Sequence, residues 1–271
     1  MNNKKIILGL APIGGWGQSN RNPIHAEDIV RQVCECAQEG VSLVHLHARD
    51  KQGHLSADTR YFAGIIQSIK KSSKVILEAS TGGLSSLTPS ERALPLKVKN
   101  IEMGSLNMGS LNFGDQVYIN RLPDIRNWIQ VMQQYQIQPC MEIFDTSHMR
   151  IAHLIIKEKL IKPPYHFNFI FNCQWGMAFS LPLLQILVDM LPKHSQWGVV
   201  FAQNYDFKGH LKAILWGANM IRVGFEDSQI YKGQYAENNI VLVKEIRRLI
   251  KNLGYQLATP KEARELFQLS C

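Results

Sequence analysis

Two histidines separated by a single residue, His45 and His47, stand in the segment SLVHLHARD. The apolar run before them predicts a buried strand, on which residues two apart point to the same face. Both imidazoles would therefore lie side by side at the C-terminal end of that strand. Such a pair can bind a transition metal, and a third ligand oxygen would leave one coordination position open for chemistry. A lone buried histidine is usually structural, but the paired spacing favours a metal site.

A second group of reactive side chains ends the last apolar run, IRVGFED, with Arg222, Glu226 and Asp227. One carboxylate can ligate a metal, and the other could act as a base. Arg222 would orient this base and hold down its pKa. The alternative is a surface loop with a simple ion pair. The position at the end of a predicted strand favours the functional interpretation.

Polar residues also end the other apolar runs, which suggests a lined pocket. They are Ser80 in ASTGG, Ser105 and Asn107 in GSLNMGSLNFGD, Glu142 in MEIF, Asn172 and Gln203.

Eight apolar runs read as buried strands, with helical patterns between them. They cover 5–11, 42–47, 74–80, 100–107, 138–144, 167–172, 197–203 and 219–225. The alternation predicts an α/β protein with a parallel sheet. An open doubly wound sheet would show a Gly-rich fingerprint after its first strand, and GLAPIGG does not match it. Because a (βα)8 TIM barrel needs about 250 residues, the 271 residues predict a single barrel domain over 1–271.

Several helices have recognisable ends. One is expected to open at Pro23 and close at Gly40, another to start at Thr88, and a third to cover 232–252. The segment ATPKEARELFQL predicts a short C-terminal helix that closes the barrel or joins a subunit contact.

Composition narrows the functional classes. The hydrophobic share of 45% and charged share of 19% are those of an ordinary globular protein. No apolar run reaches the ~20 residues that cross a bilayer, and the start does not match a signal peptide. We therefore expect a cytoplasmic protein without a membrane partner. The net charge of +8 comes from scattered residues, which fits a small polyphosphate ligand better than nucleic acid, or is only a solvated surface.

The set HLHARD, ASTGG, SLNMGSLNFGD, PCMEIFD and IRVGFED resembles the β-keto acid cleavage enzymes, in the same order and from about residue 5 to the end. This resemblance implies a zinc-dependent (βα)8 barrel, generally a homotetramer. It also implies a reaction in which a β-keto acid and acetyl-CoA give acetoacetate and a new acyl-CoA.

The resemblance also implies roles for individual residues. His45, His47 and Glu226 would bind Zn2+, and Asp227, paired with Arg222, would be the base. Ser80 and Ser105 would supply hydroxyls that hold the reacting oxygens, Glu142 a pocket carboxylate and Asn107 a polar side chain beside it. Apart from the resemblance, we expect Trp16 and Gln203 to contact the substrate.

Three segments depart from the family pattern. Where an acidic residue would meet a cationic amino substrate, this chain reads GGWGQ, so Trp16 and Trp175 are expected to favour a more apolar or differently shaped keto acid. NCQWGM replaces a Gly-rich segment. FAQNYDF stands where a Gly-Arg pair is common, so other basic residues meet the phosphates of CoA or the thioester partner differs.

Two alternatives remain at this stage. A metal-dependent hydrolase of the amidohydrolase type also uses two such histidines, but it would need further histidines where Glu142 and Asn172 stand. A non-catalytic binding barrel would keep the metal and the pocket without turnover. The ligand set also admits a divalent ion other than zinc.

Overall fold

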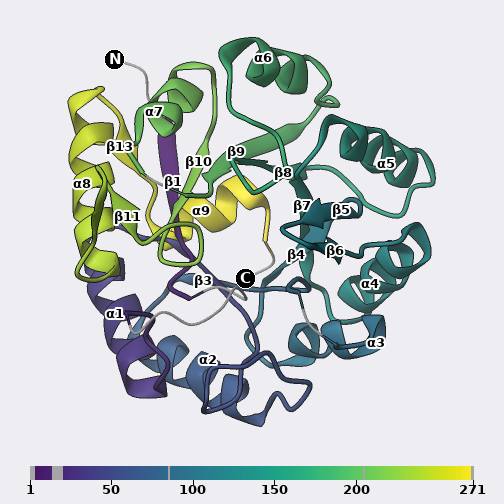
Figure 1. Ribbon diagram of the computed structural model, residues 1–271, viewed down its shortest axis with the longest axis horizontal. Helices are drawn as coiled ribbons and strands as arrows, with labels where there is room; N and C mark the ends of the chain where they lie inside the picture. The colour runs from purple at the N-terminus through teal and green to yellow at the C-terminus, as the bar shows by residue number, and fades with distance from the viewer. Residues whose placement is uncertain (1–3, 14–20, 85, 204, 270–271) are drawn as a thin grey trace.

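The computed structural model describes residues 4–13, 21–84, 86–203 and 205–269. Within these residues, eight parallel strands form a closed barrel, because the last of them pairs with the first (Figure 1). In barrel order the strands are β1 (Lys5–Leu10), β2 (Leu43–Leu46), β3 (Ile76–Ala79), β4 (Met103–Asn107), β7 (Gln138–Ile143), β8 (Tyr165–Phe171), β9 (Ser195–Phe201) and β10 (Met220–Val223). The predicted TIM-barrel fold is confirmed.

Helices surround the barrel, as Figure 1 shows. They are α1 (Ala26–Gln38), α2 (Arg60–Ser72), α3 (Pro89–Arg92) with the 3-10 turn η1 (Leu94–Lys97), α4 (Leu122–Gln134), α5 (Thr146–Lys157), α6 (Leu181–Asp189), α7 (Lys208–Leu215) and α8 (Asn239–Asn252). The long helices bury one apolar face against the strands, as amphipathic helices do. None of the described helices is long and apolar enough to cross a membrane.

The predicted helix starts are right in one case and wrong in two. Thr88 caps α3 as expected, since its hydroxyl accepts from the backbone N–H of Glu91 and the Glu91 carboxylate accepts in return. The helix expected from Pro23 begins only at Ala26, because the N-cap residue His25 is in an extended conformation.

The helix expected over 232–252 begins at Asn239. Asn238 caps it through a side-chain bond from the backbone N–H of Val241. The residues before the cap form an antiparallel hairpin of β11 (Ile230–Tyr231) and β12 (Gln234–Tyr235). The apolar residues of this hairpin extended the helical pattern in the sequence, so that expectation was wrong over the first seven residues.

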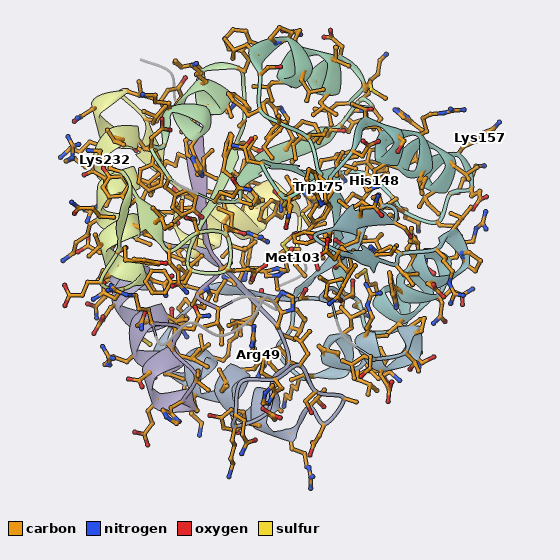
Figure 2. The ribbon with its side chains drawn as sticks, in the orientation of Figure 1. Arg49, Met103, His148, Lys157, Trp175 and Lys232 are labelled. Carbon is orange, nitrogen blue, oxygen red and sulfur yellow. The ribbon has the colours of Figure 1, made fainter. Side chains whose placement is uncertain are left out.

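The end of the barrel where the strands begin is closed by the C-terminal segment. Strand β13 (Gln256–Leu257) pairs with β1, and helix α9 (Pro260–Phe267) follows it. Phe267 of α9 belongs to a buried cluster with Ile7, Leu43 and Met103 from the strands. In the figures α9 lies in the middle of the ring, and so does Met103 (Figures 1 and 2), whereas Lys157 lies at the outer edge.

A second hairpin, of β5 (Leu111–Phe113) and β6 (Gln116–Tyr118), follows β4. The buried Arg92 of α3 holds its base, donating to the carbonyl of Ile119 at 2.7 Å and to the side-chain oxygen of Asn120 at 2.6 Å. The same guanidinium donates to the carbonyl of Thr81 at 2.8 Å, beyond the end of β3. Arg92 therefore fixes the hairpin relative to the strand ends.

His166 on β8 gives the barrel a pH-dependent stability. Its buried ring packs edge-on against Phe267 with the centroids 4.8 Å apart, and burial lowers its pKa to about 4. Below pH 6.5 the unfolded chain binds a proton that the folded barrel does not, so stability falls as the pH falls. We expect the free energy of unfolding to fall less in His166→Leu than in the wild type when the pH is lowered from 7 to 5. The difference should be about 2 kcal/mol, as measured by urea unfolding.

The matched control is His54→Leu, since the side chain of His54 is 73% exposed. Its pH dependence should follow that of the wild type. Equal losses in wild type and His166→Leu would show that His166 titrates normally in the folded protein.

Candidate active site

A cavity of about 380 Å³ opens at the end of the barrel where the strands terminate. Barrel enzymes keep their active sites at this end. Residues predicted from the sequence that line it are His45, His47, Ser80, Glu142, Gln203, Arg222, Glu226 and Asp227.

Three of these side chains converge as predicted for a metal site. The Nε2 atoms of His45 and His47 each lie 3.5 Å from Oε1 of Glu226. All three ligand atoms fall within 4.8 Å of one another. The three residues therefore form a site that can hold a metal ion, with the arrangement of two imidazoles and one carboxylate found in catalytic zinc enzymes.

The surroundings fit a divalent cation. Oε2 of Glu226 is buried, and no group among the described residues donates a hydrogen bond to it. Four acidic side chains and two guanidiniums are buried around the site: Glu78, Glu142, Glu226, Asp227, Arg49 and Arg222. The acids outnumber the guanidiniums by two, so the buried groups around the site favour a bound cation.

Gly224 brings the carboxylates over the barrel. Its φ of +142° is one that side chains rarely adopt, and an added Cβ would lie 2.2 Å from the carbonyl oxygen of Ala11. This close approach lets the backbone N–H of Glu226 donate to the same carbonyl at 3.1 Å. The turn after β10 therefore requires glycine.

Arg222 connects the acidic side chains of the site. Its guanidinium donates to both oxygens of Asp227, at 2.6 and 3.1 Å, and to Oε1 of Glu226 at 3.2 Å. A further bond of 3.2 Å reaches Oε1 of Glu142 on β7. This single side chain thus joins β10, the loop after it and β7, three strands away around the barrel.

Arg222 lowers the pKa of Asp227 as expected, but its effect does not outweigh that of burial. Burial raises the pKa of Asp227 above its usual range, and although Arg222 opposes this effect, the negative charge of Glu226 adds to it. Burial likewise raises the pKa of Glu142 to about 7 against the influence of Arg222. For Glu226 burial acts in the same direction, but His45 and Arg222 outweigh it and lower the pKa.

The two predicted serines occupy different positions. Ser80 lines the cavity, and its Oγ accepts from the backbone N–H of Gly82 at 3.0 Å. Ser105 is fully buried, with its Oγ 3.5 Å from that of Ser80. Asn107 is also buried, and neither polar atom of its side chain has a partner among the described residues. Only Ser80 of these three lies on the described cavity wall.

Of the two tryptophans expected at the pocket, the structure describes one. Trp16 lies outside the described residues. Trp175 (Figure 2) has a 70% exposed side chain and is not part of the described cavity lining, so that expectation is wrong. Gln203 does line the cavity, and its backbone N–H donates to the carbonyl of Asp227 at 3.0 Å.

Glu78 is a site residue that the sequence reasoning missed. It lies directly opposite His45 in the pairing of β2 with β3, and its Oε2 is 2.7 Å from Nδ1 of His45. Both side chains are only 1% exposed. A carboxylate bonded to Nδ1 leaves Nε2 free to face a metal and raises its basicity. The available signal was a single acid inside the apolar run KVILEAS.

We expect Glu78→Gln to raise the Kd for zinc about 10- to 100-fold, because the amide keeps the size of the side chain but removes its charge. Competition with a chelator measures this constant. Glu158→Gln is the control, since Glu158 pairs with Arg126 on the outer surface. An unchanged zinc affinity in Glu78→Gln would mean that His45 is oriented without Glu78.

The fold and these donors define a TIM-barrel protein with two histidines and one carboxylate that could hold a metal ion at the carboxyl end of its strands. The family model described as beta-keto acid cleavage enzyme matches residues 5–269. This chain therefore belongs to the β-keto acid cleavage enzyme family and is an enzyme of that family.

Individual relatives agree with this assignment. The chain is 33% identical to a "3-keto-5-aminohexanoate cleavage enzyme" of Fusobacterium nucleatum, with 98% of each chain covered. It is 29% identical to a "3,5-dioxohexanoate:acetyl-CoA acetone transferase" of Paraburkholderia graminis, over 98% of this chain and 96% of that protein. The apo structure of ObcA has the same fold, with a TM-score of 0.79 at 17% identity over 93% of this chain and 66% of that one.

Proposed function

We propose that the enzyme converts a β-keto acid and acetyl-CoA into acetoacetate and a new acyl-CoA, with zinc held by His45, His47 and Glu226. The observation that carries this proposal is the meeting of the three ligands with the Arg222–Asp227 pair in one cavity. The relatives support it, because the names of two of them give keto acids, and one of those names includes acetyl-CoA.

A bound divalent metal would polarise the keto and carboxylate oxygens of the substrate and so lower the cost of forming an enolate. Asp227 would take the proton from C2 of the keto acid. The two bonds from Arg222 fix the orientation of this carboxylate, and its raised pKa makes it a stronger base than an ordinary aspartate. The hydroxyl of Ser80 would hold a reacting oxygen at the cavity wall, with Ser105 behind it.

The amidohydrolase alternative lacks support at the two strand ends where it needs histidines. Glu142 on β7 is bonded to Arg222 instead. Asn172, which follows β8, accepts from the backbone N–H of Phe179 through its side-chain oxygen.

The homotetramer implied by the family resemblance stays a prediction, which light scattering of the purified protein tests.

The proposal is tested by metal analysis together with an assay of acetoacetate release from β-keto acids and acetyl-CoA. We expect about one zinc per chain, loss of activity on chelation and its return with added zinc. Bound zinc without acetoacetate from any keto acid would favour the non-catalytic barrel. If the protein binds no metal, the assignment of His45, His47 and Glu226 as metal ligands is wrong.

We expect Asp227→Asn to lower kcat by about 10²- to 10⁴-fold, because the amide cannot accept the C2 proton. Its zinc content should equal that of the wild type. The control is Asp58→Asn, since Asp58 pairs with Arg60 at the surface. Near-normal kcat in Asp227→Asn would assign the base to another residue.

A further inference from the structure

We infer that this enzyme selects β-keto acids whose substituent beyond the keto carbon is uncharged and apolar. The inference rests on the proposed function and concerns the same cavity. It follows from the division of the cavity into two regions of opposite character, which we name the charged floor and the apolar wall.

The charged floor consists of the metal ligands and the side chains that Arg222 joins: His45, His47, Glu142, Arg222, Glu226 and Asp227. The apolar wall consists of Leu84, Phe113, Phe144, Ile170, Ala202 and Ile230. In the proposed reaction the carboxylate and keto oxygens of the β-keto acid would bind at the metal ligands. Because the charged floor and the apolar wall line one cavity, the remaining substituent would lie against the wall.

The apolar wall is built by packing rather than by loosely placed side chains. Phe113 and Tyr118 of the β5–β6 hairpin belong to one buried cluster with Phe144 and Ile170. The rings of Tyr118 and Phe144 meet edge-on at 6.1 Å. The Tyr118 hydroxyl accepts from the backbone N–H of Gly83 at 3.0 Å. Since Arg92 also fixes the hairpin, the wall is formed before a substrate binds.

Every charged side chain among the described lining residues belongs to the floor, and each has an ionic partner there. Arg222 already donates to three carboxylates. The remaining polar lining residues, such as Gln174 and Gln229, are neutral. The segment 14–20 reads GGWGQSN, and Ser85 and Asn204 are uncharged as well, so the undescribed residues between 4 and 269 carry no acid or base.

An ammonium or a second carboxylate at the wall would therefore lose water without gaining an opposite charge, which is strongly unfavourable. An alkyl group would gain from burial instead. We expect each added methylene that reaches the wall to raise kcat/KM about fourfold. A charged end group should lower kcat/KM by at least about 100-fold.

The test uses three keto acids of equal length with the zinc-loaded enzyme and acetyl-CoA. They are 3-oxohexanoate, which ends in a methyl, 5-amino-3-oxohexanoate, which adds an ammonium on C5, and 3-oxoadipate, which ends in a carboxylate. We expect acetoacetate release at the highest kcat/KM from 3-oxohexanoate. A charged acid used within threefold of 3-oxohexanoate, or better, would overturn the inference.

A variant locates the selectivity. Leu84→Glu places a carboxylate on the half-buried rim of the wall. The measured quantity is kcat/KM for 5-amino-3-oxohexanoate divided by kcat/KM for 3-oxohexanoate. We expect the variant to raise this ratio by at least about tenfold, at unchanged zinc content. Leu215→Glu makes the same change at a 61% exposed position on α7, and its ratio should equal that of the wild type. Equal ratios in both variants would contradict the role of the wall.

Calorimetric binding of the same three acids without acetyl-CoA separates the two proposals. Preferred binding of 3-oxohexanoate without release of acetoacetate from any acid would reject the proposed reaction and support the apolar selectivity. Release of acetoacetate without a preference for 3-oxohexanoate in binding or turnover would support the reaction and reject the selectivity.

Discussion

The arrangement of the active site depends on one buried guanidinium. Arg222 is 4% exposed and contacts three carboxylates that would repel one another if it were absent. Removing ions from water is expensive, and only close opposite charges with well-directed hydrogen bonds offset that cost. Glu142, Glu226 and Asp227 can share one buried site because the planar, always charged arginine donates to all of them at once.

The rest of the barrel holds these charged side chains in place. Below it, α9 and the starts of the strands form an apolar layer around Phe267. Beside it, Glu78 fixes the ring of His45 through the register of two neighbouring strands. Beside it, the β5–β6 hairpin supplies Phe113 and Tyr118 to the cavity lining. The polar chemistry is thus confined to one level of the barrel, where a low local dielectric strengthens each interaction.

The fold and the histidine pair could be predicted because strand and helix periodicity are short-range rules, whereas the choice of Glu226 as the third ligand came from the family resemblance. The strand period puts His45 and His47 on one face, and the closed barrel brings Glu226 to them from the far end of the chain. Glu78 could not be predicted, because its bond to His45 depends on the register between two strands. The pKa of Asp227 depends on how deeply the carboxyl is buried. The exposure of Trp175 depends on the path of a loop. Neither quantity can be read from residue spacing.

The β5–β6 hairpin is inserted between β4 and α4, and it contributes Phe113 and Tyr118 to the cavity but none of the metal ligands. Its polar anchor, Arg92, comes from a different connection and bonds mainly to backbone oxygens, which any sequence supplies. Selection can therefore rewrite the hairpin while the ligands and the Arg222 network stay constant. Divergence within one lineage would then proceed by exchanging a surface segment, and a new specificity could arise without a period in which the chemistry is lost.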